Sequence, residues 1–195
     1  MANLDIKVKS SALIALHCQV GILNHVLTQP ERSRMLTKLK KVIGTARKVG
    51  IPIIYAVVQF REDYPEISHR NILFNRIKDA RRLRALDPDA RICDKIQPLP
   101  KEIIVTHRRI NAFFGSDLDL VLRAMGKDTI LLAGVESLGV VESTARFAAD
   151  MDYRTIVLAD CCVDRDPVAN EFAMTTLFPR VCTVCNSDDL LASIS

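Results

Sequence analysis

Two histidines that each follow a short apolar segment are the residues of this chain best placed to do chemistry. His17 follows the segment Leu13–Leu16, and His107 follows Ile103–Thr106. A neutral imidazole can donate or accept a proton near neutral pH and can also bind a metal ion. If both segments are parallel strands of one sheet, their carboxyl ends lie at the same edge. We therefore expect the two imidazoles to meet there and to hydrogen-bond directly or through one water.

Apolar segments alternate with amphipathic segments along the whole chain. Continuous runs of Val, Ile and Leu predict buried strands at Leu13–Leu16, Ile53–Val58, Ile103–Thr106, Thr129–Ala133, Thr155–Ala159 and Val181–Val184. Apolar residues at helical spacing predict helices at Glu31–Val49, Asn71–Ala85, Asp117–Met125, Gly139–Met151 and Pro167–Leu177. This alternation requires parallel strands joined by right-handed crossovers. We expect one α/β domain over residues 1–195, a three-layer, doubly wound, Rossmann-like, six-stranded parallel sheet.

The carboxyl ends of the strands are where such a sheet binds its ligand. That rule predicts one crevice, formed by His17, Gln59, His107, the loop Gly134–Val140 and Asp160. Neighbouring residues of a strand point to opposite faces, so the thiol of Cys18 should face the helices and not the crevice.

The composition limits the classes of protein to which this chain can belong. With 49% apolar and 26% charged residues, it is a packed globule and not a disordered chain. No apolar run approaches the ~18 residues of a membrane span, and Ala12–Leu16 is too short for a signal peptide. We expect a cytoplasmic protein whose six cysteines are core residues. A net charge of +4 with 5% aromatic residues and no Trp disfavours nucleic acid as a partner. The basic residues of Arg76–Arg91 are interpreted as a solvated helix face.

Four segments in a fixed order carry a resemblance to a known family. They are Ala12–Gln19, Val105–Asp119, Gly134–Arg146 and Leu158–Asp164. In that order they resemble an apolar strand ending in Asp-x-Gln, a Lys-containing strand followed by Ser-Ala-Phe and Gly-Thr-Asp-Leu, a Gly-Val-x-Thr-x-x-Cys-Val-x-x-Thr-Ala-Arg turn, and an Asp-Ala-Cys strand end. These are features of the isochorismatase-like, or cysteine hydrolase, superfamily. The resemblance implies the isochorismatase-like hydrolase fold and a homodimer or larger homo-oligomer.

The chemistry that the resemblance implies is changed at all three catalytic positions. The family uses a Cys nucleophile at a strand-to-helix turn, an Asp base and a Lys. The matching positions here are Val140, His17 and His107. A valine side chain cannot attack a carbonyl, so the thiol mechanism is absent. Two uncharged imidazoles keep the site neutral, as an Asp paired with a Lys does. The resemblance further implies a non-proline cis peptide at Val135–Glu136, and turn N–H groups that converge on a small anion or water.

Two functions from different classes remain open. The favoured one is a small-molecule-binding or catalytically degenerate member of the hydrolase fold, in which His17 and His107 are a polar pair at the bottom of a vestigial pocket. The alternative is a hydrolase of a small amide, ester or vinyl ether that uses water activated by one of the two histidines. Two His ligands are too few for a typical zinc site without help from Glu136 or another loop residue, so no metal or cofactor is expected.

Residues close to the triad positions are expected to contact the ligand. They are Gln19, Gln59, Phe113, Glu136, Ser137 and Gly139. The apolar residues Ile110, Phe113 and Phe114 follow the third strand in a loop that cannot bury all of them in one core. Clustered exposed apolar side chains are typical of interfaces, so this loop is the expected contact between copies of the chain.

Overall fold

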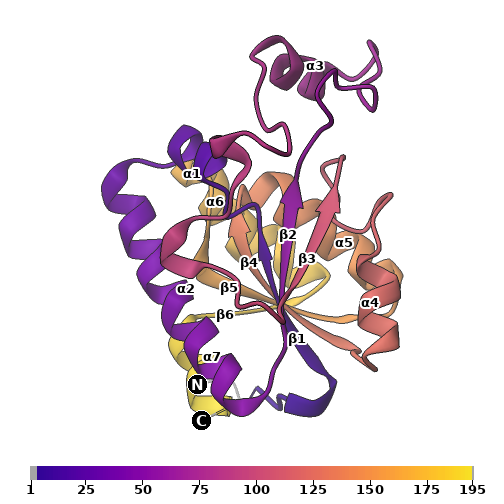
Figure 1. The fold of residues 1–195 in the computed structure, drawn as a ribbon. Helices are drawn as coiled ribbons and strands as arrows, with labels where there is room; N and C mark the ends of the chain where they lie inside the picture. The colour runs from indigo at the N-terminus through magenta and orange to yellow at the C-terminus, as the bar shows by residue number, and fades with distance from the viewer. Residues whose placement is uncertain (1–3, 195) are drawn as a thin grey trace.

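The computed structural model describes residues 4–194 and has one sheet of six parallel strands. The strands are β1 (Ser11–Leu16), β2 (Ile53–Val58), β3 (Ile103–His107), β4 (Thr129–Val135), β5 (Arg154–Val163) and β6 (Thr183–Cys185). Their order in the sheet is β3-β2-β1-β4-β5-β6 (Figure 1). The order reverses between β1 and β4, which is the point where a doubly wound sheet opens a crevice for a ligand.

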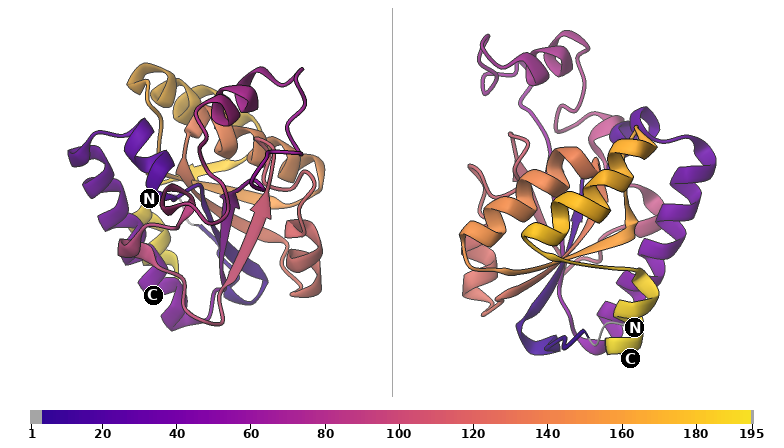
Figure 2. Two further views of the ribbon diagram at one scale, coloured as in Figure 1. Left: turned by 45° about the horizontal axis from the view of Figure 1, so that its top comes forward. Right: turned by 180° about the vertical axis from the view of Figure 1, so that it is seen from behind.

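Helices cover both faces of this sheet, as the three-layer prediction requires. They are α1 (Val20–Val26), α2 (Gln29–Val49), α3 (Ile72–Asp79), α4 (Leu118–Ala124), α5 (Glu142–Asp150), α6 (Pro167–Phe172) and α7 (Ser187–Ile194). Helices α2 and α7 lie on one face, and α4 and α5 lie on the other (Figures 1 and 2). No helix within residues 4–194 is long and apolar enough to cross a membrane. The predicted doubly wound α/β fold is confirmed.

The alternation of side chains along β1 divides the core into two clusters. Leu13 and Ala15 pack with α2 and α7, whereas Ile14 and Leu16 pack with α4 and α5. All six residues of β1 are buried, as expected for a central parallel strand. Each fully buried Leu or Ile stabilises the fold by roughly 1.5–3 kcal/mol relative to an exposed one. Because the whole strand is buried in this way, β1 and the residue that follows it are held in place. Cys18 lies in the α2 cluster, which confirms that its thiol faces the helices.

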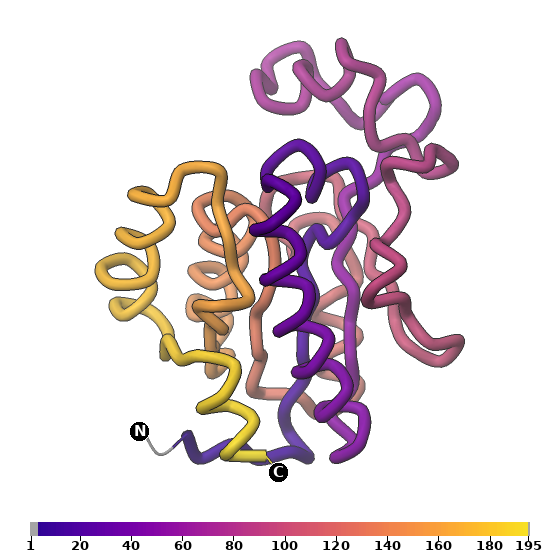
Figure 3. Tube along the Cα trace, turned by 90° about the vertical axis from the view of Figure 1, so that its left-hand side faces the viewer, coloured from indigo at the N-terminus to yellow at the C-terminus, as the bar shows by residue number. Residues whose placement is uncertain are grey.

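The residues at its two ends explain where helix α2 begins and ends. Thr28 and Glu31 form a reciprocal capping box at the first turn of α2, and Pro30 occupies the beginning of the helix. Gly50 ends it with φ of 85°, a left-handed conformation that glycine adopts without a steric penalty. Helix α2 therefore spans 21 residues and covers the sheet from end to end (Figure 3).

Some predicted elements differ from the observed ones. The helix expected over 71–85 ends at Asp79, because Arg81 (φ 49°) and Leu83 (φ 61°) take left-handed conformations that turn the chain back. The strand expected over 181–184 is Thr183–Cys185. Helices α1 and α7 were not anticipated, because each has only seven or eight residues and so little helical periodicity to detect.

The segment between β2 and the turn at Ala90 extends beyond the strand ends. We call residues 59–90 the cap; it contains α3 and stands apart from the sheet (Figures 1 and 3). The cap has its own apolar cluster, which includes Phe60, Phe74 and Leu83. Its chain is tied across this cluster by the hydrogen bond from Phe60 N–H to Leu83 O (2.9 Å). Val58 of β2 belongs to the same cluster, so the cap is a cover that packs onto the carboxyl end of this strand.

Candidate ligand-binding site

The two histidines predicted to meet are in direct contact. The Nε2 atoms of His17 and His107 are 3.0 Å apart, and the two rings stack with centroids 4.9 Å apart. His17 follows β1 with φ of 52°, and this left-handed turn aims its side chain across β2 toward the end of β3. His107 is fully buried, whereas His17 is partly exposed. The prediction that the imidazoles hydrogen-bond is confirmed.

The hydrogen-bond partners of the pair define where its protons lie. His107 Nδ1 is 2.8 Å from the carbonyl oxygen of Arg109, which can only accept, so His107 carries its proton on Nδ1. In a neutral ring its Nε2 is then an acceptor, and the proton in the 3.0 Å contact belongs to His17 Nε2. It follows that Nδ1 of a neutral His17 has a free lone pair.

Burial keeps both rings uncharged. Burial lowers the pKa of His107 to about 4, although the hydrogen bond to Arg109 O acts in the opposite direction. Burial, and then the neighbouring His107, hold the pKa of His17 well below its usual value. No carboxylate approaches within hydrogen-bond distance of either ring among the described residues to stabilise an imidazolium. The pair is therefore neutral at physiological pH.

Val140 occupies the position where the resemblance implies a nucleophile. It lies in the π-type turn η4 (Ser137–Val141) that joins β4 to α5, and its side chain is 2% exposed. The Val135–Glu136 peptide bond before this turn is cis, as the resemblance implied. Val140 and His17 line the same cavity, so the structure brings the three triad positions together.

The cavity that Val140 and His17 share has a volume of about 490 Å³. Strand ends and the η4 turn form one side of it, through residues such as Val58, Glu136 and Gly139. The cap forms the other side, and α1 closes one edge. The remaining lining residues are Ile22, His25, Val26, Leu73, Phe74, Arg76, Ile77, Ala80, Arg82, Leu83, Ile110 and Arg165.

Glu136 and Gly139 lie where the sequence placed them, against the ligand cavity. Burial and the nearby Asp164 raise the pKa of Glu136, whereas Arg165 lowers it. Arg165 Nη2 is 3.5 Å from Glu136 Oε1, so the acidic side chain already has a cationic partner.

Gln59 and Asp160 do not line this cavity, which corrects the single-crevice expectation, and neither does Gln19, which was expected to contact the ligand. The amide of Gln19 is fully buried, where it donates to the carbonyl oxygens of Val58 and Ala90 and accepts from Val58 N–H. Gln19 therefore ties β2 to the base of the cap instead of binding a ligand.

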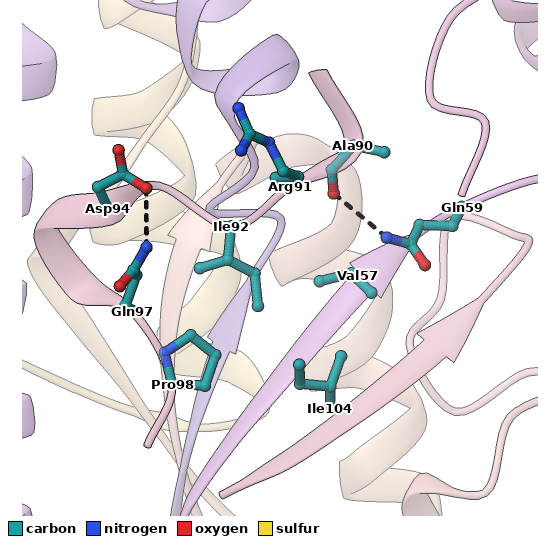
Figure 4. Close-up of a pocket in the computed structure, with 9 residues that line it drawn as sticks. All are labelled: Val57, Gln59, Ala90, Arg91, Ile92, Asp94, Gln97, Pro98 and Ile104. Atoms are coloured by element: carbon teal, nitrogen blue, oxygen red, sulfur yellow. Dashed lines mark hydrogen bonds between the residues drawn. The ribbon is translucent and has the colours of Figure 1, made fainter. Parts of the chain in front are cut away.

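Gln59 lines a different cavity of about 310 Å³ and donates to Ala90 O at 3.3 Å (Figure 4). Asp160 accepts hydrogen bonds from the N–H and hydroxyl of Ser187 and pairs with Lys38 at 2.9 Å. Asp160 thus connects β5, α7 and α2 on the far face of the sheet. The strand predicted to end at Ala159 continues to Val163, so Asp160 lies within β5 and not at its carboxyl end.

Two further residues expected to contact the ligand, Phe113 and Ser137, contact other side chains of the protein instead. Phe113 is 5% exposed and packs against Phe147 and Tyr153. The hydroxyl of Ser137 is within 2.6 Å of Asn170 Oδ1, to which it donates. Neither side chain lines the cavity of His17.

Three N–H groups of the η4 turn donate hydrogen bonds to other groups of the protein. Leu138 N–H donates to the Asp164 carboxylate at 2.9 Å. Gly139 and Val141 N–H donate to Glu136 O at 3.2 and 3.3 Å. The expectation that the turn's N–H groups converge on a small anion or water is therefore wrong for these three.

The sequence did not indicate that arginines would line the cavity. Arg76 and Arg82 belong to the segment interpreted as a solvated helix face, yet both line the cavity. Arg165 reaches it from the segment after β5, and His25 reaches it from α1. Their spacing in the sequence carries no signal, because the turn at Arg81 and Leu83 decides where this part of the cap points. Within residues 4–194, no group of three or more His, Cys, Asp or Glu side chains is arranged to hold a metal ion.

Comparisons with known proteins agree with this geometry. A model of the isochorismatase domain matches residues 11–189. The ureidoacrylate amidohydrolase RutB of Rhizobium rhizogenes is 28% identical over 179 residues, which cover 82% of this chain and 70% of that protein. The structure of N-carbamoylsarcosine amidase from Thermoplasma acidophilum matches with a TM-score of 0.74 at 29% identity, over 92% of this chain and 97% of that one.

A cysteine hydrolase from Pseudomonas syringae pv. phaseolicola shares the fold more closely, with a TM-score of 0.87 at 21% identity over 97% of this chain and 94% of that one. Because the domain model spans all six strands, the protein belongs to the isochorismatase family.

Proposed function

We propose that this protein binds a small organic molecule in the cavity of His17 and does not perform the thiol chemistry of cysteine hydrolases. One observation carries the proposal. The described side chains that line the cavity include no Cys, Ser, Thr, Lys or Tyr, and Val140 stands at the nucleophile position. The carboxylate of Glu136 is paired with Arg165, and the imidazoles of His17 and His25 complete the groups that could attack a carbonyl. The cavity therefore has the components of a binding site without a hydroxyl, thiol or amine nucleophile among the described residues.

The size and lining of the cavity favour a ligand of a few carbon atoms with polar ends. A volume of about 490 Å³ lies within the range of small-molecule sites, which combine apolar walls with a few polar groups. The free lone pair of His17 Nδ1 fits a ligand N–H or O–H donor. The related enzymes RutB and N-carbamoylsarcosine amidase are named for reactions of small amides, and an amide supplies such an N–H donor.

Hydrolysis by water activated at His17 is the second candidate, and the free lone pair is the observation that favours it. A general base works best when its pKa lies near the working pH. Burial and His107 hold the pKa of His17 well below its usual value, so it removes a proton from water weakly. His107 is neutral as well, and it offers no negative charge to stabilise the imidazolium that would form. Binding without turnover is therefore the better supported function.

Calorimetric titration with a panel of small amides and esters, combined with an assay for released ammonia or alcohol, tests the proposal. We expect at least one compound to bind, with no product formed. The variant His17→Phe should lose binding, whereas His69→Phe, which alters an exposed histidine outside the cavity, should retain it. Product release that disappears in His17→Phe would instead establish the second candidate. A panel that does not bind at all would refute the proposed function.

A further inference from the structure

We propose that the ligand of this cavity carries an oxyanion group, which the guanidinium groups of Arg76 and Arg82 bind on the cap side while the neutral His17 accepts a hydrogen bond on the strand side. This inference rests on the proposed function, because it assigns the chemical class of the ligand in the same cavity. It predicts a small organic anion with an uncharged hydrogen-bond donor at its other end.

The charges that line the cavity are unbalanced. Three arginines line it, namely Arg76, Arg82 and Arg165, against the single acidic side chain of Glu136. The pair of Arg165 and Glu136 at 3.5 Å accounts for one charge of each sign. Arg82 has Asp89 at 3.8 Å outside the cavity lining, and Arg76 has no acidic partner among the described residues, so the cap adds a guanidinium charge that Glu136 does not balance. An anion in the cavity would balance this charge through charge-assisted hydrogen bonds.

Arg82 is held in place with part of its guanidinium unoccupied. Its Nη2 donates to Gly21 O at 2.7 Å, and its Nε is 3.8 Å from Asp89. Within the described residues, Nη1 of Arg82 donates no hydrogen bond. A guanidinium whose orientation is already fixed loses less conformational entropy when it binds an anion.

Arg76 has no ion pair or side-chain hydrogen bond to any residue of the described chain, although it lines the cavity. It lies on α3, six residues before Arg82, and the left-handed turn between them brings both side chains to the same cavity. The nearby Lys78 on α3 is exposed and does not line the cavity. Both residues are exposed, and Arg76 lines the cavity whereas Lys78 does not, so Lys78 is the matched control for Arg76.

The arginines that line the cavity also act on His25. Burial first, and then the charges of Arg82 and Arg165, lower the pKa of this histidine. A field that disfavours a third cation is one that attracts an anion. The walls between the cap and strand sides include Ile22 and Val26, which suit a short carbon chain between the two polar ends of the ligand.

Three compounds of equal chain length test the inference by titration calorimetry. They are succinamate, which has one carboxylate and one amide, the neutral diamide succinamide, and 3-phosphonopropionamide, which carries a phosphonate in place of the carboxylate. We expect an anionic compound to bind roughly tenfold or more tightly than the diamide, because hydrogen bonds to charged groups are the stronger ones. The preference should weaken as the salt concentration rises. Which anion binds more tightly identifies the oxyanion as a carboxylate or a phosphorus oxyacid.

Matched variants locate the anion. Arg76→Gln should reduce the affinity for the preferred anion roughly tenfold and leave that for the diamide unchanged. Arg82→Gln should do the same, and Lys78→Gln should change neither. Thermal denaturation identifies any variant that is not folded, and Arg76→Gln guards against this outcome because Arg76 is exposed. Equal affinities for anion and diamide would overturn the inference and leave the proposed function intact. No binding by any of the three, with no binding by the wider panel of amides and esters, would refute both.

Discussion

Acid should destabilise this protein through the buried His107, and the direction follows from its burial. Burial lowers the pKa of His107 from 6.5 to about 4 in the folded protein. Between these two values the unfolded chain binds a proton that the folded protein does not. Stability is therefore greatest above the unfolded pKa and is lost as the pH falls toward about 4. The lowered pKa of His17 acts in the same direction.

The size of the effect follows from the difference in pKa. One pKa unit corresponds to about 1.4 kcal/mol, so the full shift of His107 is worth about 3.5 kcal/mol at most. Between about pH 7 and about pH 4.5, linkage predicts a loss of about 2.5 kcal/mol from this residue. That is a large fraction of the 5–15 kcal/mol by which proteins are typically stable.

Urea unfolding at the two pH values, compared between the natural protein and His107→Gln, measures this loss. Carboxyl groups titrate in both proteins and cancel in the comparison. The variant removes hydrogen bonds and is less stable at neutral pH, but its stability should fall by about 2.5 kcal/mol less on acidification. The exposed His69→Gln should behave as the natural protein does. A fall of equal size in His107→Gln and the natural protein would refute the assignment of a neutral, buried imidazole pair.

Three other outcomes are expected. In urea titration, Gly134→Ala should destabilise the fold by about 3 kcal/mol or more, because the added Cβ would overlap Leu16 O. Gly44→Ala lies in an open part of α2 and should instead stabilise the fold by up to about 1 kcal/mol. Iodoacetamide should leave ligand binding unchanged, because no cysteine lines the cavity; loss of binding on alkylation would contradict this. We expect sedimentation to detect a dimer or larger oligomer through the half-exposed Ile110 and Phe114, and Phe114→Ser to weaken it. A monomer at every concentration would refute that interface.

The strands and the histidine pair could be predicted because both depend on strong local signals. Continuous apolar runs identify buried parallel strands, and the residue that ends a strand must lie at the carboxyl edge of the sheet. His17 and His107 each follow such a run, so their meeting required only the correct strand order. The position of Val140 followed instead from the resemblance to the family's strand-to-helix turn, and it lies in the turn η4 that follows β4.

The side chains that line the cavity could be predicted less accurately than the strands and the histidine pair. Gln19 and Gln59 also follow strands, but hydrogen bonds to the backbone at Ala90 turn their amides away from the cavity. Those acceptors belong to the end of the cap, which no periodic pattern describes. In the same way, Arg76 and Arg82 read as surface residues, because their position depends on non-glycine residues in left-handed conformations.

Under the proposed function, the neutral histidine pair and the arginines of the cap contribute different parts of ligand recognition from different parts of the fold. An ion pair at the triad positions would place fixed charges next to the ligand, whereas two uncharged imidazoles leave only a hydrogen-bond acceptor there. The excess charge of the cavity comes from Arg76 and Arg82, and these belong to a cap with its own apolar cluster. Substitutions in the cap can therefore alter which ligand charge is preferred while the strand ends keep their geometry. The charge preference and the hydrogen bond at His17 should accordingly vary independently in variants of this protein.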